Sequence, residues 1–462
     1  MLKFDYDITD LHGAEYNPRR ISEEDLETLA QSIKELGIVK PIIVRNKLIV
    51  AGHQRTKALL KLGIKTAPVY VLPNNVTTYD EIRFNQLHNG TDMDSGDEEA
   101  VIEGGFSQLG FSIIESSRIH GNFNSRLAVV RKEICDLIMT YGPWGAVVAT
   151  KSGEIIHCAQ YALASCITRK PLTVYVIEDG YKEKYSRYLN KKYGVFSYDH
   201  LKKETYIQSF AQMYRLREGN SEKMNKSTLY ETMVIPYLIK NPTARAIDFG
   251  SGQGDYALML RKKGYSIHDV ELFRRKENSL NLTEINRLID KMVRDLERYG
   301  PYDVVICDSV MNSIDSDEAE TSVVKVLNLL CKMGGRMFIS GRSRESVDAF
   351  LRLKKLGGMK RYIEFVDDKG YTALYRKGSW FYQKFHTEEQ VNELIQSHGF
   401  KIEIHERKRS RTSWQVSSVK IREISFDELL QSIDFEFNLP IGNSHRLNRH
   451  TDMRKVVQKL YA

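Results

Sequence analysis

A glycine-rich turn within residues 244–272 constrains the fold of this chain more than any other feature. The segment reads ARAIDFGSGQGDYALMLRKKGYSIHDVEL: an apolar strand ends at Asp248, a loop and a helix follow, and a second strand ends at Glu271. The loop has a glycine at every second position: Gly250, Gly252 and Gly254. Glycines let the backbone approach a ligand closely, and a carboxylate at the end of the next strand can bind ribose hydroxyls. The segment predicts a Rossmann-like unit that holds a dinucleotide or an adenosyl group.

The pattern Asp-x-Gly-x-Gly-x-Gly, with an acid 23 residues after the aspartate, resembles motif I and the second-strand acid of class I S-adenosylmethionine-dependent methyltransferases. A nicotinamide-binding domain would instead show Gly-x-Gly-x-x-Gly. Three later segments resemble the fourth strand, the fifth strand and the closing helix and strand of that family: YDVVICDSVMNSI, KMGGRMFISGR and FHTEEQVNELIQSHGFKIEIHE. The resemblance spans about residues 225–410 and implies a methyltransferase domain, which we place at residues 225–425.

The same resemblance implies roles for individual residues. Asp248 and the glycine loop would hold the methionine part of S-adenosylmethionine. Glu271 would bind the ribose, and Asp269, two residues earlier on the same face of the strand, is its rival for that role. Asp308 and Asn312, just past the fourth strand, would face the methyl donor and the substrate and so form the catalytic pair.

The acceptor of the methyl group is not apparent from these segments. DNA enzymes that methylate amino groups carry an Asp/Asn-Pro-Pro-aromatic loop after the fourth strand, where this chain has CDSVMN, and a Pro-Cys nucleophile is absent as well. The standard base-methylation mechanisms are therefore disfavoured. The DSVMNSI loop loosely resembles methyltransferases associated with DNA phosphorothioation clusters. His386 is a candidate base because of its place near the closing segment, but a structural histidine is the favoured interpretation.

The N-terminal region contains a second polar corner, in the stretch LIVAGHQRTKALLKLG. The residues Gly52, His53, Gln54 and Arg55 stand between a strand-like run and a helix-like run. Backbone N–H groups at a helix N-terminus form an anion site, so a phosphate would fit this corner. The plain alternative is a strand end with an exposed arginine.

This corner belongs to a longer pattern. The segments NPRR, a Leu/Ile helix ending at Gly37, KPIIV, LIVAGHQRTKALLKLG and PVYVL follow in the order and spacing of the ParB/sulfiredoxin superfamily, over residues 1–95. In that family the Gly-x-x-Arg box and the Asn-Pro-x-Arg segment hold nucleotide phosphates, of CTP in the partition proteins. The resemblance implies that CTP or ATP, with Mg²⁺, binds here. The residues implied are Arg19, Arg20, Gly52, His53, Gln54 and Arg55, with Asn85 and Gln86 of RFNQLHNG as weaker members.

Two departures from the superfamily limit what the resemblance implies. Sulfiredoxins carry a reactive cysteine beside this corner, whereas the first cysteine of this chain is Cys135, which disfavours a sulfinic-acid reductase. Partition proteins carry a helix-turn-helix module directly downstream, and we identify no convincing one in this sequence.

Residues 96–224 are assigned to a mixed α+β middle region that begins in an acidic linker. The stretch GEIIHCAQYALASCITRKPLTVYVI, residues 153–177, parallels NKLIVAGHQRTKALLKLGIKTAPVYVL in the N-terminal region. It is either a degenerate second copy, in which Tyr161 or a neighbour replaces the arginine and which is structural only, or a chance similarity. Residues 178–219 interleave Lys, Arg and Tyr, a pattern that suits either nucleic-acid contact or ordinary packing.

Composition adds weaker constraints. The net charge of +8 is compatible with a polyanionic partner, although 68 cationic residues are offset by 60 anionic ones. Five scattered cysteines without a C-x-x-C pair indicate reduced thiols and no zinc site. No apolar run approaches the roughly 20 residues of a membrane span, and the N-terminus does not resemble a signal peptide, so we expect a cytoplasmic protein without a membrane partner. Residues 426–462 are assigned to a C-terminal tail.

Together these features predict an α/β multidomain chain: an α+β ParB/sulfiredoxin-like domain, the mixed middle region and a Rossmann-like methyltransferase domain. We expect an S-adenosylmethionine-dependent methyltransferase coupled to a nucleotide-binding domain, acting on DNA or a nucleic-acid-related acceptor, with a homodimer as the assembly to consider. One alternative is a nucleotide-switched protein that binds DNA or a partner and keeps the methyltransferase fold as a scaffold. Another is a ParB-like nuclease or NTPase.

Overall fold

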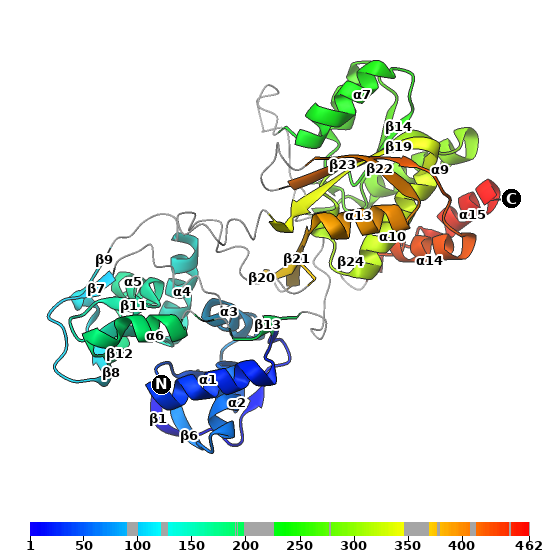
Figure 1. Cartoon of the computed structure of the whole chain (residues 1–462). Coiled ribbons are helices and arrows are strands. Elements are labelled where there is room, and N and C mark those ends of the chain that lie inside the picture. The colour runs from blue at the N-terminus through cyan, green and yellow to red at the C-terminus, as the bar shows by residue number, and fades with distance from the viewer. Residues whose placement is uncertain are drawn as a thin grey trace. The chain divides into compact units, whose positions relative to one another are not determined.

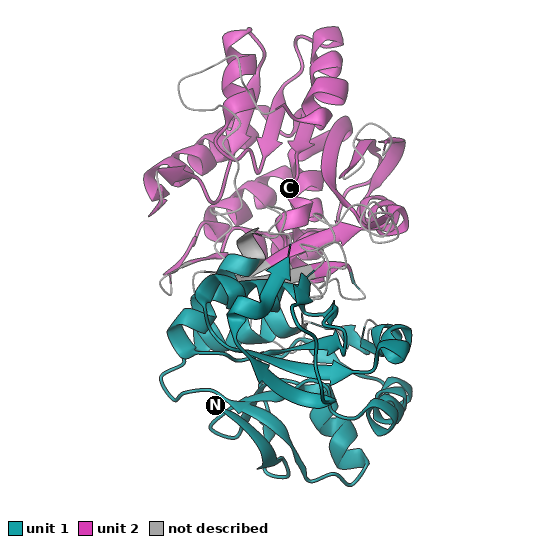
Figure 2. Ribbon diagram, turned by 90° about the vertical axis from the view of Figure 1, so that its left-hand side faces the viewer, with its two compact units in different colours: residues 1–203, 350–369, 373–378 teal, residues 204–349, 370–372, 379–462 magenta. Residues whose placement is uncertain are grey.

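The computed structural model describes residues 1–89, 100–121, 128–189, 191, 193–197, 226–276, 279–345, 369–376, 379–406, 413–442 and 445–461. The chain divides into two compact units, shown in Figure 2: an N-terminal unit of residues 1–203, 350–369 and 373–378, and a C-terminal unit of residues 204–349, 370–372 and 379–462. Residues 1–89 and 100–189 lie in the same unit, so the boundary expected near residue 95 does not separate two compact bodies. The basic run 407–411 and most of the Lys/Arg/Tyr stretch beyond residue 197 lie outside the described residues.

The first sheet of the N-terminal unit has the strand order β1-β6-β4-β5-β2. Its strands are β1 (Leu2–Asp7), β2 (His12–Gly13), β4 (Ile42–Arg45), β5 (Leu48–Ala51) and β6 (Thr66–Val71), and its helices are α1 (Glu23–Leu36), α2 (His53–Lys61) and α3 (Thr78–Asn89) (Figure 1). Helix α1 ends where the sequence predicts, because Gly37 follows it with a φ of 77°. It begins after Ser22, whose side chain accepts a hydrogen bond from the Asp25 N–H.

The second sheet of this unit has the strand order β11-β10-β12-β8. Its strands are β8 (Gly110–Ile114), β10 (Ala146–Thr150), β11 (Ile155–His157) and β12 (Leu172–Ile177), and its helices are α4 (Ala128–Tyr141), α5 (Ala159–Thr168) and α6 (Lys182–Leu189). Two short strand pairs complete the unit: β7 (Ala100–Ile102) with β9 (Ile119–Gly121), and β3 (Arg19–Arg20) with β13 (Val195–Phe196).

The two sheets have the same construction. The first strand, β1 or β8, pairs antiparallel with the last, β6 or β12. The last strand runs parallel to β4 or β10, which forms an antiparallel hairpin with β5 or β11. One helix precedes each hairpin and one follows it. The residue before the second helix has a left-handed conformation in both, with φ of 98° at Gly52 and 64° at Cys158.

The two sheets also share one hydrophobic core. Tyr70 and Phe84 of the first part pack in the same cluster as Trp144 and Tyr161 of the second. The rings of Phe84 and Trp144 meet edge to face with centroids 5.0 Å apart. The Tyr161 hydroxyl accepts hydrogen bonds from the Trp144 and Gly145 N–H groups at 2.8 and 2.9 Å. Tyr161, considered as a replacement for the phosphate arginine, is thus a buried packing residue.

The C-terminal unit is built on an eight-stranded sheet. Four parallel strands form its centre: β15 (Ile267–Val270), β14 (Ala246–Phe249), β18 (Tyr302–Cys307) and β19 (Cys331–Ser343). Strand β23 (Ser413–Lys420) runs antiparallel between β19 and β22 (Phe400–Glu406), and β21 (Ser379–His386) and β20 (Tyr371–Arg376) continue from the end of β19. The carboxyl ends of β14, β15 and β18 therefore meet at one edge.

Helices cover both faces of this sheet, as in a Rossmann-like fold. On one face a π-helical turn (Tyr230–Val234) that continues into α7 (Ile235–Lys240) packs with α8 (Asp255–Lys262). On the other face lie α9 (Leu282–Tyr299), α10 (Asp317–Leu330) and α13 (Glu388–Ser397). The predicted mixed α/β architecture is confirmed.

Residues 426–461 complete the core of this second face. They form α14 (Phe426–Glu436), the hairpin of β24 (Pro440–Gly442) and β25 (His445–Arg446), and α15 (His450–Tyr461). Leu429, Ile433 and Val457 are fully buried in the main hydrophobic cluster, with α14 against α10 and α15 against α9. Their description as a tail is wrong.

Between β15 and β18 the described chain contains only the short pair β16 (Arg275–Lys276) and β17 (Ser279–Leu280) and helix α9.

Candidate active site in the C-terminal unit

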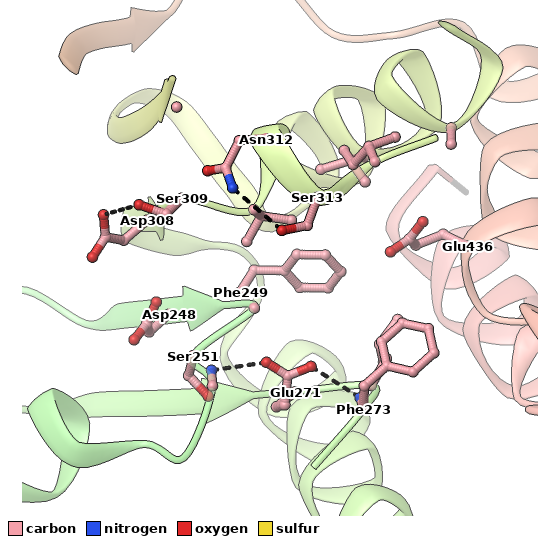
Figure 3. A pocket seen from close by; sticks show the side chains of 18 of the residues that line it. Asp248, Phe249, Ser251, Glu271, Phe273, Asp308, Ser309, Asn312, Ser313 and Glu436 are labelled. Atoms are coloured by element: carbon pink, nitrogen blue, oxygen red, sulfur yellow. Dashed lines mark hydrogen bonds between the residues drawn. The ribbon is translucent and has the colours of Figure 1, made fainter. Parts of the chain in front are cut away.

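A cavity of about 470 Å³ opens at the carboxyl ends of β14, β15 and β18. Ligands of open parallel sheets bind at this edge. Six of the residues that the sequence singles out line the cavity: Asp248, Gly250, Gly252, Glu271, Asp308 and Asn312. Figure 3 shows most of them around the side chain of Phe249, together with Glu436 from α14. The structure therefore brings the glycine loop and the predicted carboxylates together.

Asp248 is the last residue but one of strand β14, and it is held by a tyrosine that the sequence did not point to. The Tyr230 hydroxyl donates a 2.6 Å hydrogen bond to Asp248 Oδ2. The Tyr230 ring stacks on Tyr256 of α8, with centroids 4.0 Å apart and an interplanar angle of 6°. Tyr230 lies in the π-helical turn, 18 residues before Asp248. No periodicity or motif in the sequence connects it with the glycine loop.

The Tyr230→Phe variant should lose about 1–3 kcal/mol of unfolding free energy, the usual cost of removing one buried hydrogen bond to a charged group. Urea unfolding measures this loss. Tyr237→Phe is the matched control, because that hydroxyl makes no hydrogen bond within the described residues. Equal stabilities of the two variants would contradict a supporting role for Tyr230.

Glu271, at the end of β15, fastens the glycine loop. Its two carboxylate oxygens accept backbone hydrogen bonds, Oε2 from the Gly252 N–H at 2.8 Å and Oε1 from the Phe273 N–H at 2.9 Å. Glu271 therefore shapes the loop and also lines the cavity.

Asp269, the rival of Glu271, does not line the cavity. Its carboxylate forms ion pairs of 2.6 Å with both Arg261 and Arg274. Burial tends to raise the pKa of Asp269, but the hydrogen bond and charge of Arg261 and the charge of Arg274 outweigh it and leave the pKa lowered. A Cβ at Gly254 would come within 2.7 Å of Asp269 Oδ2. The structure thus corrects the assignment of Asp269 and Gly254 as cofactor contacts: Asp269 is a structural anion, and Gly254 makes room for it.

Asp308 and Asn312 line the cavity from the loop after β18. The Ser340 hydroxyl donates to Asp308 Oδ1 at 2.7 Å and accepts from the Ser309 N–H at 3.0 Å. The Asn312 amide donates to the Ser313 hydroxyl at 3.3 Å. This loop packs tightly on the glycine loop, since a Cβ at Gly250 would lie 2.2 Å from Val310 Cγ2. Gly250, whose φ is 79°, is therefore required on both conformational and steric grounds.

His386 lies away from the cavity lining, at the end of β21. It is buried, and its Nε2 lies 2.7 Å from Glu320 Oε1 of α10. Lys384 forms a second ion pair with Glu320 at 3.6 Å. This geometry agrees with the structural interpretation of His386 that the sequence favoured over a catalytic base.

Glu436, the last residue of α14, is a functional candidate that the sequence missed. Its side chain lines the cavity, although the residue is only 6% exposed. Burial, and next the charge of Glu271, raise the pKa of Glu436 from 4.5 to about 8. At neutral pH the carboxyl is therefore predominantly protonated. No local pattern marks Glu436, because it lies within residues 426–462, 165 residues after Glu271.

The raised pKa makes the stability of the protein depend on pH. The contribution of Glu436 to the free energy of unfolding is fully present below about pH 4.5 and is lost as the pH rises towards 8. The reason is that Glu436 loses its proton at a lower pH in the unfolded state than in the folded state. The Glu436→Gln variant should therefore be more stable than the wild type by about 1–4 kcal/mol at pH 9, with the difference disappearing towards pH 5. Unfolding at the two pH values measures this, and a constant difference would contradict it.

A second cluster of interest lies at the N-terminal corner. Arg55 Nη1 donates to the Lys40 carbonyl at 2.5 Å, and Arg55 Nη2 lies 3.0 Å from His88 Nε2. Burial lowers the pKa of His88 well below its ordinary value, and the charges of Arg55, Lys40, His157 and Arg19 add to this effect. We call these five residues the cation cluster. The lowered pKa leaves His88 itself neutral at neutral pH, and an anion would stabilise the charged members of the cluster.

His53 and Gln54 hold neighbouring segments of this corner in place. His53 Nε2 accepts a hydrogen bond from the Ala14 N–H at 3.0 Å, and burial, then the charge of Lys57, lower the pKa of His53 to about 4. The Gln54 amide donates to the Arg19 carbonyl at 3.0 Å. A neutral, fully buried His53 can position the corner but cannot supply charge to it.

The remaining candidates are more scattered. The buried Asn85 donates from its amide to the Val50 carbonyl at 2.8 Å, which joins α3 to β5. Gln86 is half-buried on the same helix, and Arg20 is exposed on β3, paired with Val195. Arg19, Gly52, Gln54 and Arg55 thus form one corner, whereas none of the contacts found for Arg20 and Gln86 joins them to Arg55.

Two family models match this chain. Residues 222–404 match a methyltransferase domain, so the C-terminal unit carries a methyltransferase domain with a Rossmann-like fold. Residues 5–89 match the ParB N-terminal domain. The chain therefore joins a ParB N-terminal domain to a methyltransferase domain, which confirms both resemblances predicted from the sequence.

Curated relatives match the N-terminal part. The chromosome-partitioning protein ParB of Caulobacter vibrioides (strain NA1000 / CB15N) is 45% identical over 62 residues, 12% of this chain and 20% of that protein. A probable chromosome-partitioning protein ParB of Xylella fastidiosa (strain 9a5c) is 44% identical over 70 residues, 14% of this chain and 23% of that protein. The chain thus spans about a fifth of the length of the curated relatives it matches.

Solved structures align with part of the chain. A SAM-dependent methyltransferase from Methanosarcina mazei is 16% identical, with 40% of this chain and 98% of that one covered and a TM-score of 0.29. Magnesium protoporphyrin IX methyltransferase from Synechocystis PCC 6803, with bound SAH, is 19% identical, with 42% and 82% covered and a TM-score of 0.28.

None of the helices described is long and apolar enough to cross a membrane. Nor do the described side chains include a group of three or more His, Cys, Asp or Glu arranged to hold a metal ion.

Proposed function

We propose that the methyltransferase domain binds S-adenosylmethionine in the cavity and transfers its methyl group to an acceptor. The observation that carries the proposal is the convergence of Asp248, the glycine loop and Glu271 at one sheet edge. Gly250 and Gly252 bring no side chains into the cavity, and Glu271, after the second strand, stands where a carboxylate can bind ribose hydroxyls. The volume of about 470 Å³ lies within the range of small-molecule and cofactor sites. The residues present fit the cofactor.

S-adenosylmethionine, when bound, supplies an electrophilic methyl group on a sulfonium centre. The chain's own contribution is to position the acceptor in line with that methyl group and to exclude water. Asp308, fixed by the Ser340 hydroxyl, is the group best placed to orient an acceptor N–H or O–H and to take up its proton. Asn312 offers a donor and an acceptor beside it.

We further propose that the ParB N-terminal domain binds the phosphates of CTP or ATP, with Mg²⁺, at the cation cluster, and that this nucleotide controls methyl transfer. The repulsion between Arg55 and Arg19, and the positive charges of Arg55, Lys40 and Arg19 around His88, support an anion at this place. The net charge of +8 supports DNA or a nucleic-acid-related compound as the acceptor, in the cytoplasm.

Transfer of labelled methyl from S-adenosylmethionine to duplex DNA, single-stranded DNA, RNA and a nucleotide mixture, with and without CTP or ATP and Mg²⁺, tests both proposals. We expect label in a nucleic acid, with a rate that one nucleotide changes. Tight S-adenosylhomocysteine binding without label in any acceptor would instead favour the scaffold alternative or an acceptor of another class. Phosphate release or DNA cleavage that needs Arg55 would favour the NTPase or nuclease alternative.

A further inference from the structure

The cavity has two chemically different sides. Asp248 and Asp308 lie on one side of Phe249 in Figure 3, and Glu436 lies on the other, with Phe273 nearby. Leu439, three residues after Glu436, also lines the cavity. Two aromatic rings and aliphatic side chains around the Glu436 carboxyl, with Glu271 beside Phe273, form a site for a flat heterocycle that carries hydrogen-bonding groups on one edge.

The Glu436 carboxyl faces the cavity. No hydrogen bond or ion pair joins its side chain to the residues that the structure describes. Its hydrogen-bonding groups are therefore available to a ligand in the cavity. A protonated carboxyl offers one donor and one acceptor side by side, which matches the N1 acceptor and the N6 amino donor of adenine.

We propose that Glu436 is the specificity-determining residue for the adenine ring of the cofactor and pairs with its N1/N6 edge as a neutral acid. The inference rests on the proposed binding of S-adenosylmethionine. It assigns a contact to helix α14, which lies beyond residues 222–404 that match the methyltransferase model. The C-terminal segment thereby becomes part of the cofactor site.

Several charged groups act on this carboxyl. Glu271 at the end of β15 disfavours its ionisation, and the buried Cys307 of β18 lies within its electrostatic influence. Asp248, Asp308, Asp315 and Arg342 line the remainder of the cavity. Because three of these four are acids, an ionised Glu436 would add to an already anionic wall, which favours the neutral form that the pairing requires.

Calorimetric binding of S-adenosylhomocysteine and of its 1-deaza analogue, which has C–H in place of N1, tests the inference on the full chain at pH 6.5. We expect the wild type to bind the analogue about 10-fold more weakly, the loss typical of one buried hydrogen bond. Glu436→Ala should bind S-adenosylhomocysteine about 10-fold more weakly and show no preference between the two ligands. A full preference in Glu436→Ala would overturn the inference.

Glu436→Gln provides a second test that does not depend on the folding of the alanine variant. Glutamine keeps one donor and one acceptor at all pH values. We expect wild-type affinity to fall about 10-fold between pH 6.5 and 9.5 as the carboxyl ionises, and Glu436→Gln to lose most of this dependence. The same pH dependence in both proteins would overturn the inference. A wild type that binds no S-adenosylhomocysteine would overturn the proposed function as well, whereas binding with an unaltered Glu436→Ala preference would overturn this inference alone.

Discussion

Replacing Gly252 with arginine should raise the Kd for S-adenosylhomocysteine at least about 100-fold, a loss of about 2.7 kcal/mol of binding free energy. Gly252 lines the cavity, has a φ of 60°, and donates its N–H to Glu271 Oε2. A long cationic side chain at this position fills the space of the ligand and places a charge beside Glu271. Isothermal titration calorimetry measures the effect, and methyl transfer should be lost with the binding.

Gly264→Arg is the matched control for this experiment. Gly264 follows helix α8 with a φ of 90°, so an arginine there meets the same backbone strain. A Cβ at this position would meet no atom within 4 Å, and Gly264 does not line the cavity. We expect Gly264→Arg to bind the ligand like the wild type. A folded Gly252→Arg protein that still binds S-adenosylhomocysteine would rule out this cavity as the cofactor site.

The second large effect is expected at the opposite end of the chain. Arg55→Ala should weaken CTP or ATP binding, measured by calorimetry with Mg²⁺, by about 10–100-fold, because buried charge-assisted hydrogen bonds are the strong ones. The variant also removes the donor to the Lys40 carbonyl. Arg55→Lys retains the positive charge without the guanidinium geometry, so its nucleotide affinity should fall less than that of Arg55→Ala.

Lys57→Ala tests whether nucleotide binding depends on where a positive charge lies or only on the net charge of the protein. Lys57 lies on the same helix as Arg55 but is exposed to solvent. Removing its charge should change nucleotide affinity less than about 2-fold, as expected for a screened surface charge. Equal losses in Arg55→Ala and Lys57→Ala would show that only net charge matters and would remove the case for a phosphate site at this corner.

The sequence predicts the glycine-loop side of the candidate site because that side follows from local chemistry. A strand, three glycines and an acid lie within 24 consecutive residues, Asp248 to Glu271. Their spacing alone brings them to one sheet edge. The spacing could not show which of Asp269 and Glu271 is the ribose-binding acid, since both are acids on one face of one strand. Arg274, which neutralises Asp269, follows β15 and approaches only in the folded chain.

The other side of the cavity could not be predicted, because it depends on contacts between distant segments. Tyr230 reaches Asp248 from a π-helical turn, and Glu436 reaches the cavity from α14. Neither residue has a local pattern that sets it apart from ordinary packing residues. Buried polar side chains that complete a site from a distant helix become recognisable only when burial and partners are known.

Within the N-terminal unit, we keep as a proposal that residues 153–177 belong to a second copy of the fold formed by residues 1–89. The structure adds support to it. The parallel in sequence covers one strand, one helix and the VYV strand. The parallel in structure extends to the order and sense of three strand pairs, β8 with β12, β12 with β10 and β10 with β11. The left-handed residue before the second helix, Cys158 in place of Gly52, follows the same plan. His157, a member of the cation cluster, precedes Cys158, so the second copy also contributes to the candidate anion site.

Helices α14 and α15 have a consequence for how the protein matures. Their residues Leu429, Ile433 and Val457 fill the core beneath β14 and α9, which are synthesised well over a hundred residues earlier. During translation the sheet can begin to form, but one face of it remains uncovered until residues 426–461 have left the ribosome. Glu436 reaches the cavity in that same late step. The nascent chain should therefore depend on chaperones over this interval, and the proposed cofactor site should be complete only at its end.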